Sequence, residues 1–131
     1  MGAEGGRVVA ITGTSCSPDN RVWRDAFVRL QERGRVVFSA AIAGAVFATL
    51  NRGLCRQNDA GMYVTAVCGV LDLDTRTLSF SAAGHEAPVL VRGADGRCAS
   101  LETEGGRILG LLEGGAYPVS TVSLAPGDAL V

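Results

Sequence analysis

The chain has 131 residues, of which 47% are hydrophobic and 19% are charged. Two full domains are excluded, because single domains cluster at roughly 100–150 residues, and the apolar content excludes a globally disordered chain. The net charge of −1 hides an asymmetry. Residues 1–56 hold eight Arg and four acids (+4), whereas residues 57–131 hold four Arg and nine acids (−5). The Arg residues are dispersed and only 5% of residues are aromatic, so we expect no nucleic-acid partner.

The spacing of the cysteines argues against a zinc site, and the N-terminus indicates a cytoplasmic protein. The four cysteines are separated by 39, 13 and 30 positions and the chain has one His, whereas zinc sites use closely spaced ligand pairs. The N-terminus lacks the pattern of a secretory signal peptide, so we expect reduced thiols and a cytoplasmic protein. The most apolar stretch, residues 36–50, has 15 residues. A membrane-spanning helix needs about 20, so we expect no membrane anchor.

The N-terminal third predicts a strand, a turn and a helix. Residues 7–15 (RVVAITGTS) are typical of a buried strand that runs into a turn at Gly13. A phosphate-binding loop would need a second Gly followed by Lys, and the chain has no Lys, so the strand and turn are preferred to a nucleotide site. After the capping residues 17–20, helical spacing predicts an amphipathic helix that ends near Gly34, with its apolar face at Trp23, Ala26, Phe27 and Leu30. Residues 36–38 are compatible with either a strand or a helix.

A second helix and a series of strands are predicted for the rest of the chain. Apolar residues recur at helical spacing over residues 43–56, while Thr49, Arg52 and Arg56 face away. From Gly61 onward, β-branched and small apolar residues come in short runs between turn formers, which predicts antiparallel β structure. We expect strands at residues 62–71, 77–82, 88–92, 98–101 and 119–124, and turns at 72–76, 93–96 and 125–128. A last strand begins at Ala129 and has no partner, from which we expect a chain cut short of its fold.

Several short segments of the second half occur in a distinctive order and spacing. They are Leu50–Leu54, Met62–Ala66, Gly69–Asp72, Ala82–Leu90, Ile108–Leu111 and Leu124–Leu130. In this order they resemble the bacterial metal-dependent (PPM-type) serine/threonine phosphatases, a family that includes stage II sporulation protein E and phosphatases that regulate sigma factors. The likeness covers residues 45–131, about two-thirds of the chain.

The resemblance implies an α+β fold, a partial α/β/β/α sandwich of two antiparallel sheets with flanking helices. It divides the chain into a divergent N-terminal segment, residues 1–44, with a strand and an amphipathic helix, and a partial phosphatase domain, residues 45–131, truncated before its last strands. It also implies hydrolysis of phosphoserine or phosphothreonine on small regulatory proteins. In that chemistry, aspartates hold two Mn²⁺ or Mg²⁺ ions, which activate a bridging water.

The aspartates of that metal site are not found at the matching positions. The family carries Gly-Asp pairs near its start and before its first long helix, and Thr-Asp-Gly after its last strand. The only Gly-Asp pair here, Gly127-Asp128, matches a turn. Asp72 and Asp74 are expected to accept hydrogen bonds from local N–H groups in a hairpin turn, in preference to binding a metal. No catalytic or metal-binding residue is therefore assigned, and we expect no Mn²⁺ or Mg²⁺ bound to this chain.

Five residues match the family's motifs without an assigned role: Asn51, Thr65, Gly84, His85 and Asp128. His85 is the only His, and a structural hydrogen bond is preferred to a role as proton carrier. The sequence assigns it no acidic or nucleophilic partner. Family members often continue the Ala-Gly-His motif with Asn-Pro, where this chain has Glu86 and Ala87.

Three hypotheses for function remain open. The first is a fragment of a metal-dependent protein serine/threonine phosphatase whose relatives dephosphorylate anti-sigma-factor antagonists, with negligible activity in the isolated chain. The second is a non-catalytic protein-interaction module derived from the same fold. The third is a small cupin-type jelly roll, which is ranked last because such metal sites use several imidazoles and this chain has one. Because strands are missing, we also expect self-association through an exposed sheet edge.

Overall fold

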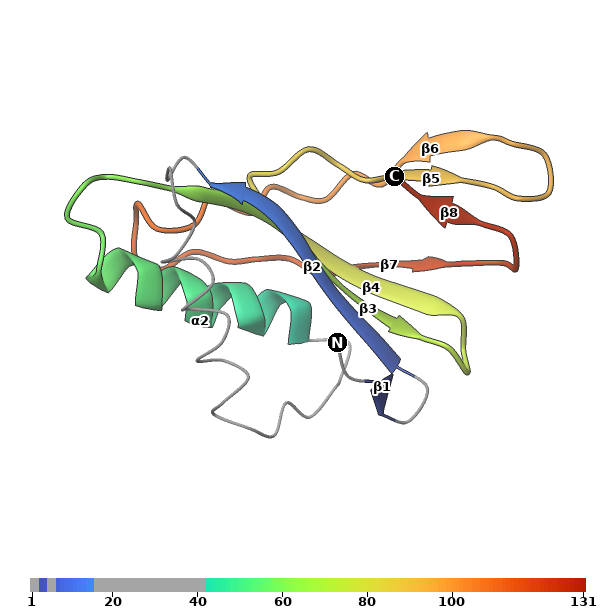
Figure 1. Ribbon diagram of the computed structural model, residues 1–131, viewed down its shortest axis with the longest axis horizontal. Helices are drawn as coiled ribbons and strands as arrows, with labels where there is room; N and C mark the ends of the chain where they lie inside the picture. The colour runs from blue at the N-terminus through green and yellow to red at the C-terminus, as the bar shows by residue number, and fades with distance from the viewer. Residues whose placement is uncertain (1–2, 5–6, 16–41) are drawn as a thin grey trace.

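The computed structural model describes residues 3–4, 7–15 and 42–131 (Figure 1). Within these ranges the chain forms a helix and a series of strands: β1 (Ala3–Glu4), β2 (Arg7–Ser15), α2 (Ile42–Arg56), β3 (Val64–Asp72), β4 (Thr77–Ala83), β5 (Val89–Val91), β6 (Cys98–Ser100), β7 (Ser120–Ser123) and β8 (Ala129–Leu130). The predicted helix around residues 23–30, and residues 36–38, lie outside the described ranges. No helix in the described part of the chain has the length and apolar character needed to cross a membrane.

The strands form two antiparallel sheets. One has five strands in the order β1-β2-β3-β4-β7, and the other has three in the order β6-β5-β8. Every pair of neighbouring strands is antiparallel. The prediction that the strand beginning at Ala129 has no partner is wrong, because β8 pairs with β5. Helix α2 lies along the five-stranded sheet, and the three-stranded sheet lies away from the helix at the other end of the molecule (Figure 1). The predicted α+β class with two antiparallel sheets is thereby confirmed.

The hairpin between β3 and β4 forms where turn residues interrupt two apolar runs. Its register places Leu71 opposite Leu78 and Asp72 opposite Thr77. In the turn, Asp72 Oδ1 accepts hydrogen bonds from the N–H groups of Asp74 (3.0 Å) and Thr75 (3.1 Å). The role predicted for Asp72 is confirmed, because its carboxylate caps local backbone as short polar side chains do in turns.

The turn predicted at Gly13 is wrong. Strand β2 continues through this glycine to Ser15, with Gly13 opposite Ala66 and Ser15 opposite Val64. Glycine weakens a strand only modestly, whereas a turn here would remove the β2 partners of the backbone groups at the start of β3. The pairing of nine residues along β3 therefore outweighs the local preference of one residue.

The core lies between α2 and the five-stranded sheet. Three helix residues at the predicted spacing are buried, namely Phe47, Leu50 and Leu54. They pack on the helix-facing side of β3 and β4 and on the later loops, with Val64, Ala66, Cys68, Ala83, Leu109 and Tyr117. The rings of Phe47 and Tyr117 lie 5.6 Å apart between centroids. Each buried apolar side chain of this size stabilises the fold by about 1.5–3 kcal/mol, so this face anchors the helix.

Candidate functional site

Asn51 is a polar residue in the apolar face of α2, and its side chain forms hydrogen bonds with the backbone of a loop. Its Nδ2 donates to the carbonyls of Leu112 (2.8 Å) and Gly114 (3.3 Å), and its Oδ1 accepts from the N–H of Gly110 (2.9 Å). The residue is 2% exposed. A buried amide can be retained at little cost when its donors and acceptors are satisfied, so Asn51 acts as a clamp between α2 and residues 110–114.

A second asparagine, Asn58, holds the same loop from the other side. Its Nδ2 donates to the carbonyls of Met62 and Gly110 (both 2.6 Å), and its Oδ1 accepts from the N–H of Met62 (2.8 Å). Gly110 is therefore bonded through its N–H to Asn51 and through its carbonyl to Asn58. Asn58 was not among the residues that the sequence motifs singled out. Its position two residues after the predicted helix and three residues before Gly61 was the available signal.

Thr65 and His85 meet at the end of β3 that adjoins the loop after β4. Thr65 Oγ1 lies 2.9 Å from His85 Nδ1, a hydrogen bond in which the donor depends on the imidazole tautomer. Both side chains are partly buried. The bond fixes the imidazole ring through Nδ1. His85 thus has a hydroxyl partner twenty positions away, which the sequence alone did not assign.

Gly84 lets the chain leave β4 at this point. Its φ of +63° lies in the left-handed region, and its N–H donates to the carbonyl of Gly106 (2.8 Å). A Cβ at this position would overlap Ile108. Glycine is required here for both reasons, so the motif position serves backbone geometry next to the Thr65–His85 pair.

Asp128 braces the turn before β8 against the β5–β6 hairpin. Its carboxylate accepts hydrogen bonds from the N–H groups of Ala125 and Gly93 (both 2.9 Å) and from an Arg92 guanidinium nitrogen (2.7 Å). The two N–H groups, and then the guanidinium of Arg92, lower the pKa of this carboxyl below its usual range. Because its oxygens are occupied by these donors, Asp128 is a structural residue, in agreement with the turn to which the sequence assigned it.

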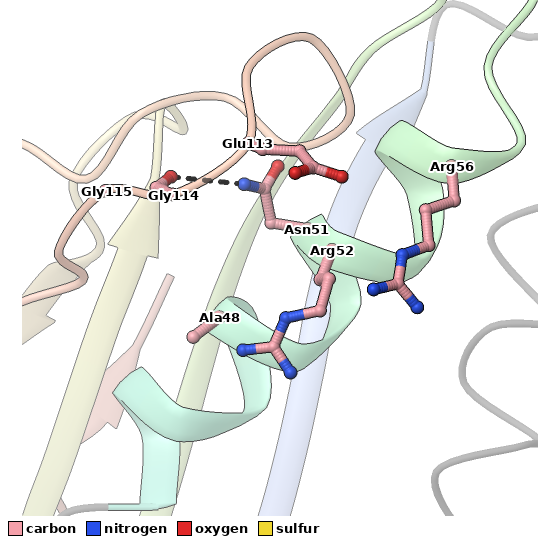
Figure 2. Close-up of a pocket in the computed structure, with 7 residues that line it drawn as sticks. All are labelled: Ala48, Asn51, Arg52, Arg56, Glu113, Gly114 and Gly115. Atoms are coloured by element: carbon pink, nitrogen blue, oxygen red, sulfur yellow. Dashed lines mark hydrogen bonds between the residues drawn. The ribbon is translucent and has the colours of Figure 1, made fainter.

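A pocket of about 230 Å³ lies between the exposed side of α2 and the loop that Asn51 holds (Figure 2). Its lining residues are Ala48, Asn51, Arg52, Arg56, Glu113, Gly114 and Gly115. Asn51 forms part of this lining, and its amide is the link between the helix and the loop side of the pocket. Arg52 and Arg56 were predicted to lie on the solvent side of the helix, and no pocket was predicted there. Its second wall comes from a loop more than fifty residues later, which no local pattern predicts.

The five motif residues are thus brought to three separate places. Asn51 joins α2 to residues 110–114, Gly84 lies beside the Thr65–His85 pair, and Asp128 joins two turns of the three-stranded sheet. The hydrogen bonds link only Thr65 and His85 to each other. No common catalytic centre follows from this arrangement.

Neither Cys55 nor Cys68 is an activated nucleophile. Burial raises the pKa of the Cys68 thiol to about 12, so its thiolate is negligible at neutral pH. Burial, and then the negative charge of Glu113, raise the pKa of Cys55. Both shifts run opposite to those of reactive cysteines, which have depressed pKa values.

The described residues do not fit a metal site of the kind the family implies. Across residues 3–4, 7–15 and 42–131, no group of three or more His, Cys, Asp or Glu side chains is placed to hold an ion. Asp72, which the sequence analysis weighed with Asp74 as a possible ligand, accepts hydrogen bonds from the backbone N–H groups of Asp74 and Thr75. Asp128, assigned to a turn, likewise accepts from the N–H groups of Gly93 and Ala125. Mn²⁺ and Mg²⁺ need several oxygen ligands in one place, and this part of the chain does not supply them.

Similar folds occur among solved phosphatase structures. The RsbU and RsbW domains of Rv1364c from Mycobacterium tuberculosis match with a TM-score of 0.78 and 23% identity, over 96% of this chain and 35% of that one. The S. agalactiae serine/threonine phosphatase matches with a TM-score of 0.78 and 14% identity, over 97% of this chain and 67% of that one. The catalytic domain of the phosphatase PstP, solved with two manganese ions, matches with a TM-score of 0.65 and 12% identity, over 98% and 70%. At these low identities, the TM-scores establish a shared fold alone.

The chain spans about a third of the length of the mycobacterial structure, and larger parts of the other two. No curated protein matches it by sequence. The family model for stage II sporulation protein E (SpoIIE) matches residues 24–131, which is most of the chain. The chain therefore belongs to the SpoIIE family.

Proposed function

We propose that this chain is part of a metal-dependent protein serine/threonine phosphatase of the kind that dephosphorylates anti-sigma-factor antagonists in the cytoplasm. The observation that carries the proposal is membership of the SpoIIE family over residues 24–131. Further support comes from the fold shared with the structure of the mycobacterial RsbU and RsbW domains and with the manganese-bound PstP domain. In this proposal the boundary predicted at residue 45 separates a divergent N-terminal segment from the phosphatase portion.

We also propose that the isolated chain does not hydrolyse phosphate esters. The support is chemical: hydrolysis by two ions needs a cage of carboxylates, and the described residues bring together no such cage. Asp19, Asp25 and Glu32 lie outside the described residues, so the experiment has to be made on the whole chain.

Metal-dependent turnover is the direct test. The full 131-residue chain is assayed with p-nitrophenyl phosphate in the presence and absence of Mn²⁺, and Mn²⁺ binding is measured by isothermal titration calorimetry. We expect no turnover above the blank and no saturable binding of the ion. A longer SpoIIE-family phosphatase domain is the positive control. Turnover that depends on Mn²⁺ and is lost with a chelator contradicts the proposed inactivity, while leaving the family membership intact.

The alternative function is a protein-interaction module that has kept the fold without the catalysis. The loop held by Asn51 and the pocket on α2 favour it, because they form an ordered surface to which another molecule can bind. The described residues, in contrast, form no cluster of metal ligands. A pull-down with a phosphorylated anti-sigma-factor antagonist domain, and with its unphosphorylated form, separates the two functions. Retention of the phosphorylated form by an inactive chain supports the module, and retention of neither form contradicts it.

A further inference from the structure

The pocket on α2 carries two cations and one anion. Arg52 and Arg56 are four positions apart, one helical turn, and leave the same side of α2 (Figure 2). The residues of this helix, IAGAVFATLNRGLCR, include no acidic side chain. Glu113 lies across from the arginines on the loop (Figure 2). The charge of the pocket lining, two arginines against one glutamate, is therefore positive.

The positive charge of this pocket is not neutralised within the described part of the protein. Of the described residues, none forms an ion pair with Arg52 or Arg56, whereas Arg92 and Arg97 each have a carboxylate partner at 2.7 and 3.2 Å. Glu113 is within the same pocket but outside ion-pair distance of both arginines. Two guanidinium groups at the rim of a pocket are thus available to a ligand of opposite charge.

The opposite wall of the pocket is held in a fixed position. Asn51 fixes the carbonyl of Gly114, and the N–H groups of Gly114 and Gly115 donate to no group within the described residues. A water molecule occupies about 30 Å³ in the liquid, so a cavity of about 230 Å³ has room for a phosphoryl group with bound water. Guanidinium groups and backbone N–H groups are the donors that proteins use for phosphate.

We propose that this pocket binds a phosphoryl dianion through Arg52 and Arg56, with the N–H groups of Gly114 and Gly115 as further donors. A carboxylate has two oxygens, whereas a phosphoryl group has three that are free to accept from both walls. The site lies on the outer side of α2 and does not rest on the proposed function, because it requires neither a metal ion nor turnover. Glu113 opposes the ligand by like-charge repulsion. Its replacement should therefore strengthen binding, whereas replacement of either arginine should weaken it.

An NMR titration with inorganic phosphate at constant ionic strength tests the site on the full chain. We expect the amide signals of Gly114 and Gly115 to shift with a Kd of about 1–10 mM, as for a few exposed ion pairs. Arg52→Gln and Arg56→Gln should each weaken binding about fivefold, the factor that corresponds to about 1 kcal/mol. Glu113→Gln should strengthen it about twofold, since it removes a like charge. Arg97→Gln, an exposed arginine outside the pocket, is the matched control and should leave the Kd unchanged.

The same spectra report whether each variant keeps its fold, through the dispersed signals of β3 and α2. Equal phosphate affinity in wild type, Arg52→Gln and Arg56→Gln overturns the proposal. A loss of affinity in Arg97→Gln as large as in the two pocket variants also overturns it. A phosphoserine peptide and its unphosphorylated form then distinguish the source of the phosphoryl group. Binding of the phosphopeptide at the same amides assigns a protein partner, and binding of inorganic phosphate alone assigns a small anion. Binding of neither overturns the site.

Discussion

Two buried or partly buried asparagines fix the loop that follows Leu109. Asn51 and Asn58 bond both the N–H and the carbonyl of Gly110, while the side chains of Leu111 and Leu112 remain exposed. A loop that is ordered by side chains in this way has little freedom to close or open. The pocket wall at residues 113–115 is consequently part of the folded structure before any ligand arrives.

Replacement of Asn51 by Leu should therefore be costly. The substitution keeps the apolar packing of α2 but leaves the N–H of Gly110 and the carbonyls of Leu112 and Gly114 without their partner. We expect the free energy of unfolding to fall by about 2–3 kcal/mol, as measured by urea denaturation. Arg52→Leu, on the neighbouring exposed residue, is the control and should change it by less than about 0.5 kcal/mol. Equal effects of the two substitutions would show that the clamp contributes nothing.

Asp128 should make stability depend on pH in the acidic range. The N–H groups of Ala125 and Gly93, followed by Arg92, lower the pKa of its carboxyl in the folded protein below the unfolded value of about 3.9. Its contribution is therefore fully present above about pH 4 and is lost as the pH falls through the lower, folded pKa. Asp128→Asn should be less stable than wild type at pH 7, and the difference should narrow toward pH 2, measured as urea midpoints. A difference that stays constant with pH contradicts this role.

At the scale of elements, α2 is the part of the fold that the sequence predicted best. The predicted range 43–56 differs from the observed Ile42–Arg56 by one residue, because three buried residues and two arginines follow the helical period closely. Strand positions were also predicted to within a few residues. The error at Gly13 arose because strand length there is decided by β3, a partner that follows some fifty residues later.

Two glycines on α2 allow the packing of this helix to be tested with one type of substitution. A Cβ at Gly53 would meet no atom within 4 Å, whereas a Cβ at Gly44 would overlap the carbonyl oxygen of Tyr117. Gly53→Ala should stabilise the protein by about 0.5–1 kcal/mol, because alanine restricts the unfolded chain and favours the helix. Gly44→Ala should destabilise it by about 1–3 kcal/mol through overpacking. Thermal or urea unfolding of both variants measures the two changes in the free energy of unfolding. A change of the same sign in both variants would contradict the contact between Gly44 and Tyr117.

At the scale of the whole molecule, the parts that the sequence missed are those made by distant segments. The Thr65–His85 bond and the pocket between Arg56 and Glu113 both depend on how strands and loops are placed in three dimensions. Local periodicity predicts which face of an element is buried, but it does not predict which loop covers the other face. Asn51 illustrates the limit: its polarity within an apolar face was visible, whereas its partners at residues 110–114 were not.

We predict that the edges of the three-stranded sheet allow association between copies of this chain. Strands β6 and β8 each pair only with β5 among the described strands, and every residue of both is exposed. Leu130 is 43% and Val131 is 83% exposed beside this edge. Unpaired strand edges with apolar side chains are templates for pairing with another chain, and a lysine at the edge opposes that pairing.

Light scattering over a range of protein concentrations should therefore show a mass that rises with concentration, and Leu130→Lys should lower that rise. Leu73→Lys is the matched control, because Leu73 is equally apolar and 50% exposed but lies in the β3–β4 turn, away from the edges of the three-stranded sheet. If the wild-type mass stays that of one chain at every concentration, the strand edges do not mediate association. If Leu73→Lys reduces association as strongly as Leu130→Lys, general surface hydrophobicity rather than strand pairing is responsible.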